Sequence, residues 1–225
     1  LPCGGRIQLL LQRLGDGDKS WVDALLLSLS KRQCVERSLE LATATTVLTP
    51  VPHFRSLTLS GQRLRHCFGP RMRMLLVGAG ELARRLAELG QAMDYEIVVT
   101  DPRAANITQW EGPEVQLIQG MPDDVIRQHA SDRHSVIITL THDPRIDDMA
   151  LMEALTTEAW YVGALGSRRT TEKRRRRLRQ LDIPESQIAR LQAPVGLAIG
   201  SKTPIEIAIS IMAQLTLLRS QASSA

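Results

Sequence analysis

The feature that most constrains this chain is a glycine-rich turn between an apolar run and a helical pattern. Residues 72–77 are mostly apolar, and Gly78 and Gly80 follow them directly. Leucines then recur at helical spacing as far as Gly90, a residue type that commonly ends helices. A β-branched run at 95–101 predicts a second strand. We therefore expect a strand, a tight turn, a helix that stops at Gly90 and a parallel strand, which together form a βαβ unit.

The alternation of strands and helices continues through the rest of the chain. Apolar runs predict strands at 115–118, 135–140 and 160–163, and helical patterns occupy 122–129, 146–155 and the basic segment 168–179. In the basic segment, Leu178 and the following Leu181 are the only apolar anchors that we expect. A capping-box pattern from Thr203 to Glu206 predicts a last helix. This order predicts an α/β fold with a Rossmann-like, doubly wound and mostly parallel sheet.

The first part of the chain has a different character. A helical pattern at 21–29 and a strand at 45–52 are the clearest elements, and the pattern weakens over residues 61–70. We expect a smaller, N-terminally truncated domain at 1–69, which carries a Cys-Gly-Gly motif, and the Rossmann-like domain at 70–225. Because the first residue is Leu rather than Met, we also expect a fragment or a processed product.

Composition excludes several classes of protein. No apolar run approaches the length of a membrane span, and no leader pattern opens the chain, so we expect a soluble cytoplasmic protein. Three cysteines without metal-binding spacing predict free thiols. Eight basic residues and one acidic residue lie between 168 and 179, so the rest of the chain is slightly acidic. Aromatic residues make up only 3% of the chain, which argues against a nucleic-acid partner.

The glycine-rich turn has the spacing of a dinucleotide-binding fingerprint. Gly78 allows the turn, Gly80 lets backbone N–H groups approach a phosphate, and Ala83 allows helix and strand to pack closely. Asp101 ends the next strand, where a carboxylate holds a ribose hydroxyl, and Arg103 is placed to hold a 2′-phosphate. The alternative is a Rossmann scaffold with an empty crevice, in which Asp101 caps a loop.

Two further strand ends carry polar groups. His142 and Asp143 follow the strand at 135–140, and central strand ends converge on the crevice of a doubly wound sheet. They are candidates for acid–base chemistry or ligand contact; the alternative is that the histidine and the aspartates near it cap a helix.

The strand at 160–163 ends in a second glycine-rich segment. Gly163 and Gly166 lead to Ser167, a predicted N-cap, and to Arg168. Glycines, a helix N-terminus and guanidinium groups suit an anionic ligand such as a phosphate. The alternative is a plain strand-to-helix connection with a solvated basic helix behind it, which we favour from Lys173 onward.

A thiol lies at the start of the chain. Cys3 precedes Gly4 and Gly5, which leave room for a bulky partner to reach the sulfur, and a thiolate is a soft ligand and a possible sulfur acceptor. Residue type alone favours a buried, inert cysteine.

Taken in order, these motifs resemble the XdhC/CoxI family most strongly over residues 72–215. The segments that carry the resemblance are Leu1 to Arg6, Val77 to Gly80, Thr100 to Arg103, Leu140 to Pro144, Tyr161 to Arg168 and Pro194 to Ala208. Three positions depart from the family pattern. A further N-terminal cysteine motif is missing, Glu81 replaces a frequent His, and Ala198 replaces a frequent Asp.

The resemblance implies a maturation factor for molybdenum hydroxylases such as xanthine or carbon monoxide dehydrogenase. Such a factor would bind the molybdenum cofactor, support its sulfuration by a cysteine desulfurase and insert it into the apoenzyme, as a chaperone without catalytic residues. Cys3 then becomes a candidate contact to the molybdenum cofactor. The candidate cofactor-binding residues are Cys3, Gly4, Gly5, Gly78, Gly80, Asp101, Arg103, His142, Asp143, Gly163, Gly166, Ser167 and Arg168.

Two other functions stay open at this stage. One is an NAD(P)-dependent oxidoreductase in which His142 carries the proton. The other is a nucleotide-sensing interaction module whose basic helix, with Arg174 to Arg177, docks an acidic partner. The small size and the resemblance lead us to expect a homodimer.

Overall fold

The computed structural model describes residues 9–223 and divides the chain into two compact units, Leu1–Pro70 and Arg71–Ala225. Cys3, Gly4 and Gly5 lie outside the described residues. Among residues 9–223, no helix has both the length and the apolar character needed to cross a bilayer.

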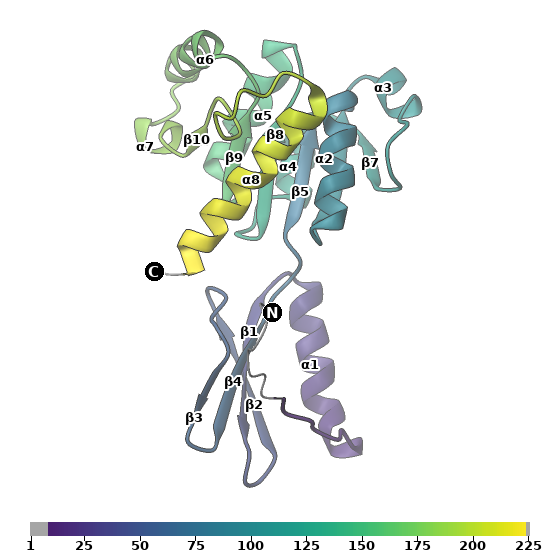
Figure 1. Cartoon of the computed structure of the whole chain (residues 1–225), viewed down its shortest axis with the longest axis vertical. Coiled ribbons are helices and arrows are strands. Elements are labelled where there is room, and N and C mark those ends of the chain that lie inside the picture. Colours follow the sequence, from purple (N-terminus) through teal and green to yellow (C-terminus); the bar gives the residue numbers. More distant parts are fainter. Residues whose placement is uncertain (1–8, 224–225) are drawn as a thin grey trace. The chain divides into compact units, whose positions relative to one another are not determined.

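The N-terminal unit is one helix packed against a four-stranded antiparallel sheet (Figure 1). Its elements are η1 (Asp16–Asp18), α1 (Lys19–Ser30), β1 (Cys34–Glu40), β2 (Thr45–Val51), β3 (Thr58–Ser60) and β4 (Arg63–Phe68), and the strand order is β2-β1-β4-β3. The guanidinium carbon Cζ of Arg37 lies over the ring of Trp21 in α1, 4.2 Å from the centroid of that ring. The sequence pattern misses β1 and β4 because charged residues interrupt the apolar residues in both strands, so that neither shows an apolar run. The segment 61–70, where the sequence pattern weakens, is therefore mostly the strand β4 and not a linker.

The C-terminal unit alternates strands and helices throughout. Its elements are β5 (Arg73–Val77), α2 (Glu81–Ala92), β6 (Glu96–Asp101), α3 (Ala104–Thr108), β7 (Gln116–Gln119), α4 (Pro122–His129), β8 (Ser135–Thr139), α5 (Pro144–Thr156), β9 (Tyr161–Ala164), α6 (Arg168–Gln180), α7 (Glu185–Ile188), β10 (Leu191–Gln192) and α8 (Pro204–Ser223). Six parallel strands form one sheet in the order β10-β9-β8-β5-β6-β7. This is the doubly wound order, so the predicted fold class is confirmed, and the order reverses between β5 and β8.

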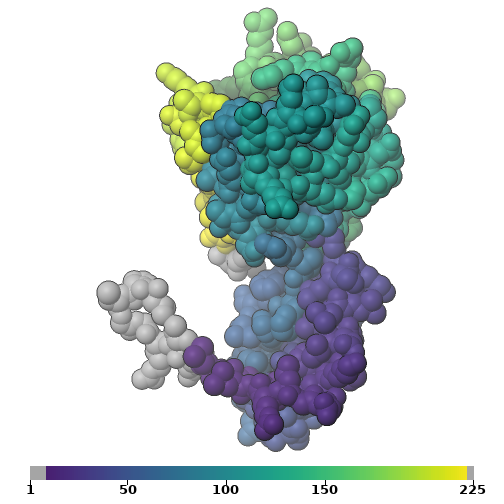
Figure 2. Space-filling model, turned by 90° about the vertical axis from the view of Figure 1, so that its right-hand side faces the viewer, coloured from purple at the N-terminus to yellow at the C-terminus, as the bar shows by residue number. Residues whose placement is uncertain are grey.

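Helices cover both faces of this sheet. Along β5, Met74 and Leu76 belong to the core cluster that includes α2 and α8, while Leu75 and Val77 belong to the cluster that includes α4 and α5. Successive residues of a strand point to opposite faces, which is why an unbroken apolar run is needed for a strand buried on both sides. In Figure 2 the teal elements that follow β6 face the viewer, and α8 lies at one edge of the unit in yellow.

Gly90 does not end its helix, contrary to our prediction. α2 continues to Ala92, and a Cβ atom at Gly90 would lie 2.7 Å from Cδ1 of Ile97 on β6. Gly90 therefore allows a close approach between helix and strand. The chain turns instead at Asp94, which has a φ of +64°.

Candidate functional site

The reversal of strand order places the glycine-rich turn beside the loop that follows β8. Gly78 has a φ of +108°, and a Cβ atom there would lie 2.9 Å from Cγ2 of Thr141. Any other residue would be strained at this position and would push the two loops apart. Gly80 is the N-cap of α2, and no atom lies within 4 Å of the position that its Cβ would take. Space is thus available at the N-terminus of α2, where an anion is favoured.

Asp101 lies at the predicted strand end, but protein donors already occupy its carboxylate. Its two oxygens accept from the N–H of Ala79 at 3.1 Å, from the N–H, Nε and Nη2 of Arg103 at 2.8–3.0 Å, and from Nδ2 of Asn106 at 2.8 Å. Burial raises the pKa of Asp101, but these hydrogen bonds outweigh burial and bring it to about 2. A ribose hydroxyl would therefore have to displace Arg103 or Asn106 from this carboxylate.

The loop after β8 lies within electrostatic range of Arg103. Asp143 is the N-cap of α5 and accepts from the N–H of Arg145 at 3.0 Å. Its pKa is lowered to about 2, first by the Arg145 side chain and more weakly by the charge of Arg103. His142 is exposed and makes no hydrogen bond or ion pair within the part of the chain that the structure describes. Asp143 thus has the helix-capping role that we weighed against ligand contact.

The predicted anion-binding segment after β9 divides into two parts. Gly163 is buried in the strand, where a Cβ would lie 2.6 Å from Cε1 of Tyr161 and 2.9 Å from Cγ2 of Val195, so its role is packing. Ser167 is the N-cap of α6 and accepts from the N–H of Thr170 at 3.1 Å. Gly166 precedes this cap with a φ of +156°.

Arg168 is exposed at the first position of α6. Among residues 9–223 it forms no ion pair with a carboxylate. The start of α6 therefore combines free backbone N–H groups with an available guanidinium, an arrangement that binds phosphate-like anions.

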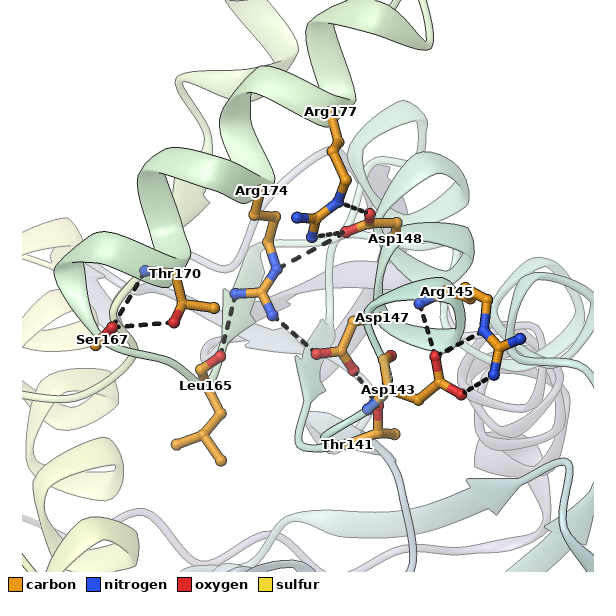
Figure 3. Close-up of polar contacts among 10 residues, drawn as sticks. All are labelled: Thr141, Asp143, Arg145, Asp147, Asp148, Leu165, Ser167, Thr170, Arg174 and Arg177. Carbon is orange, nitrogen blue, oxygen red and sulfur yellow. Dashed lines mark hydrogen bonds and ion pairs between the residues drawn. The ribbon is translucent and has the colours of Figure 1, made fainter.

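The basic helix behind this segment is solvated only in part, whereas we favoured a solvated helix from Lys173 onward: Lys173, Arg176 and Arg179 are exposed, but Arg174 is not. Arg174 is 2% exposed, and its Nη2 lies 2.8 Å from Oδ2 of Asp147, which is 1% exposed (Figure 3). Nη1 of the same guanidinium donates to the carbonyl oxygen of Leu165 at 3.1 Å. The other Asp147 oxygen accepts from Oγ1 of Thr141 at 2.7 Å.

A second ion pair joins the same two helices. Arg177 of α6 binds Asp148 of α5 through Nε and through Nη2, the latter at 3.0 Å (Figure 3). Leu181, which we expected to anchor the helix, is 44% exposed. Helix α6 is therefore held largely by buried and half-buried arginines that extend to acidic residues of α5, together with Leu178, which is fully buried.

Our thiol candidate and the rest of its motif, Cys3 to Gly5, lie outside the described residues, so the structure does not place them. Within residues 9–223, no group of three or more His, Cys, Asp or Glu side chains could hold a metal ion. Cys34 and Cys67 are buried in the N-terminal unit and form no disulfide. Burial and the neighbouring Cys67 raise the pKa of Cys34 to about 11, which makes it a poor nucleophile.

Comparison with known families gives a match in the C-terminal unit. Residues 74–215 match the family described as the XdhC Rossmann domain. This range covers the six-stranded sheet, the switch point and α6.

Curated relatives are longer than this chain, which spans about half to three fifths of the two described next. It is 31% identical over 167 residues to a probable xanthine dehydrogenase subunit of Bacillus subtilis (strain 168), an alignment that covers 73% of this chain and 47% of that protein. It is 26% identical over 219 residues to the molybdenum cofactor insertion chaperone PaoD of Escherichia coli (strain K12), covering 97% of this chain and 61% of that protein.

A solved structure shares the fold. The crystal structure of a protein described as a xanthine dehydrogenase from Bacillus halodurans superposes with a TM-score of 0.67 at 27% identity, and the match covers 90% of this chain and 65% of that one.

Proposed function

The chain belongs to the XdhC family, and from this we propose that it binds the molybdenum cofactor and helps to insert it into a molybdenum hydroxylase of the xanthine dehydrogenase type. The observation that carries the proposal is the alignment of 97% of this chain with a protein described as a molybdenum cofactor insertion chaperone. The cofactor is cargo in this role, and the protein supplies binding and orientation.

Residues at the carboxyl edge of the sheet suit the phosphate-bearing pterin of that cargo. Two helix N-termini, those of α2 at Gly80 and α6 at Ser167, lie at the carboxyl edge of the sheet. Arg168 adds a guanidinium that no carboxylate within residues 9–223 neutralises. Helix N-termini and guanidinium groups stabilise phosphate oxygens. We assign phosphate binding to the Ser167–Arg168 segment and the Gly78–Gly80 turn.

We also propose that Cys3 contacts the molybdenum and that a cysteine desulfurase supplies the terminal sulfur. A thiolate is a soft donor that suits this metal and can accept sulfur. The same proposal includes a homodimer as the working form.

The oxidoreductase alternative has less support. It requires Asp101 to accept from ribose hydroxyls, yet five protein donors already bind its two oxygens. It also requires a proton carrier at His142, which stands exposed with no orienting partner among the described residues. A general acid or base is normally held by a second group that fixes its orientation.

The proposal is tested by expressing the chain in a host that makes molybdenum cofactor. The purified protein is oxidised, and its pterin is measured as the fluorescent product for wild type, Cys3→Ser and Arg168→Glu. Arg176→Glu is the matched control, because Arg176 is exposed on the same helix but two turns away from the N-cap. We expect pterin on wild type and on the control, and much less on the other two.

Wild-type protein that carries no pterin would refute cofactor binding. Equal pterin on Arg168→Glu and Arg176→Glu would refute the assigned phosphate site alone. Hydride transfer to NAD(P) that Asp101→Asn abolishes would favour the oxidoreductase.

A further inference from the structure

We propose that Arg174 and Asp147 are positioning residues that join the loops after β8 and β9 into one wall of the cofactor site. The inference rests on the proposed function, because it concerns how that site holds the start of α6 in place. Neither residue is expected to touch the cargo. Their role is to fix the groups that do.

The first observation is that an ion pair is buried at a position where apolar residues often serve stability as well. The Arg174 and Asp147 side chains are 3% and 2% exposed. Removing two charges from water is unfavourable, and apolar residues of similar volume often replace a buried ion pair without loss of stability. Stability alone therefore does not explain the pair.

The second observation is that each member of the pair holds a different loop. Arg174 donates to the carbonyl oxygen of Leu165, just before Gly166 and the Ser167 cap of α6. Asp147 accepts from the hydroxyl of Thr141, in the loop after β8. The ion pair closes the connection between them at 2.8 Å (Figure 3).

The connection extends to the glycine-rich turn. The methyl group of Thr141 fills the space that a Cβ at Gly78 would need, at 2.9 Å. Since β9, β8 and β5 are neighbours in the sheet, one buried pair sets the spacing of three consecutive loops at its carboxyl edge. The anion-binding start of α6 is thereby held at a fixed distance from the turn at Gly78.

An arginine is required for this role. Its planar fork presents separate N–H groups to Leu165 and to Asp147, whereas the ammonium of a lysine is a point charge on a flexible stem. The neighbouring pair, Arg177 and Asp148, joins the same helices but contacts neither loop in the described structure. Asp148 also lies 4.0 Å from Nε of Arg174 (Figure 3), so this pair controls for the loss of an ion pair between the two helices while both loop contacts are kept.

The experiment compares two double variants of the full chain, Asp147→Leu with Arg174→Met, and Asp148→Leu with Arg177→Met. We expect both to fold, since each replaces an ion pair by apolar groups of similar volume. Pterin retained after expression in a cofactor-making host should fall roughly 10-fold or more in the first variant only, the effect typical of lost outer contacts that orient ligand-binding groups. Without cargo, amide hydrogen exchange should accelerate together at 140–143 and 165–168.

Three outcomes would overturn the positioning role. The first is full pterin retention by the Asp147→Leu, Arg174→Met variant. The second is an equal loss of pterin from the Asp148→Leu, Arg177→Met control. The third is amide hydrogen exchange that stays at the wild-type rate in both loops. If wild type carries no pterin, the proposed function fails, and the exchange measurement still decides this inference. Arg174→Lys keeps the charge and provides a second route if the double variant does not fold. Pterin retention by Arg174→Lys at the wild-type level would show that the bridge is unnecessary.

Discussion

Removing Arg174 alone should destabilise the C-terminal unit in a strongly pH-dependent way. In Arg174→Met, the Asp147 carboxylate stays buried without its cation. The attraction lost over 2.8 Å is about 6 kcal/mol at an effective dielectric constant of about 20. This exceeds the cost of protonating the carboxyl group, so the folded variant takes up a proton instead.

The expected magnitude follows from that proton. Against an ordinary Asp pKa of 3.8, protonation at pH 7 costs at most about 4 kcal/mol, at 1.36 kcal/mol per pH unit, and the cost is smaller because the pKa of Asp147 is already raised in the folded wild type. The lost hydrogen bond to Leu165 adds about 1 kcal/mol. We expect the free energy of unfolding to fall by at most about 5 kcal/mol at pH 7 and by at most about 3 kcal/mol at pH 5, with the smaller loss at the lower pH.

The sign of the pH dependence is fixed by the direction of the pKa shift. Burial already raises the pKa of Asp147, despite the Thr141 hydrogen bond and the charge of Arg174. A raised folded-state pKa means that stability is lost as pH rises. Loss of Arg174 raises this pKa further, so the variant should lose more stability than wild type at each step toward higher pH.

The assay is urea unfolding at pH 5, 6, 7 and 8, followed by tryptophan fluorescence. Of the three tryptophans, Trp21 lies in the N-terminal unit, so a Trp21→Phe background reports the C-terminal unit alone. Arg177→Met is the control, with an expected loss of about 1 kcal/mol because its side chain is 34% exposed. A loss for Arg174→Met that is the same at pH 5 and pH 8 would refute the reasoning.

Three further predictions concern single positions. Gly78→Ala should lower the free energy of unfolding by about 1–3 kcal/mol, because of its φ of +108° and the Thr141 contact, whereas Gly80→Ala should change it little; thermal unfolding of both compares them, and equal effects would contradict the geometry. Asp101→Asn should lower the free energy of unfolding by about 2 kcal/mol at pH 6, because the ionised carboxylate loses its hydrogen bonds. Wild type should lose the same contribution as the pH falls from about 4 to about 2, so the free energies of unfolding of the two proteins should become equal near pH 2. Cys34, with a pKa near 11, should resist alkylation at pH 8 until denaturant is added, and rapid labelling of the native protein would show that the thiol is accessible.

The fold of the C-terminal unit could be predicted because its strands are buried on both faces. Unbroken apolar runs identify β5, β6 and β8 as strands buried on both sides. Helix α4 begins at Pro122, as predicted. In the N-terminal unit, β1 and β4 carry Glu, Arg and His along their length. Their stability comes from pairing with each other, which no local pattern expresses.

The candidate site was predictable in position and less so in detail. Strand ends converge by topology, so Gly78 and Asp101 lie where the pattern placed them. The hydrogen bonds that Arg103 and Asn106 make to Asp101 depend on loop conformation, which the sequence does not reveal.

The sequence does carry a signal that Arg174 is buried. Thr171, Arg174 and Leu178 recur at spacings of three and four residues and form the buried stripe of α6. An arginine in a run of arginines is taken as solvated unless its helical position is compared with that of the apolar residues nearby.

Because Arg103 already donates hydrogen bonds to Asp101, a ligand can bind this carboxylate only by displacing them. Arg103 is two residues away in the same chain, so it competes with any incoming donor at a high effective concentration. The binding free energy that a ligand gains at Asp101 is only the difference between its own hydrogen bonds and those that it displaces. Under the proposed function, the phosphate end of the cargo, at the open helix N-termini, would therefore contribute more to binding than a diol placed at Asp101.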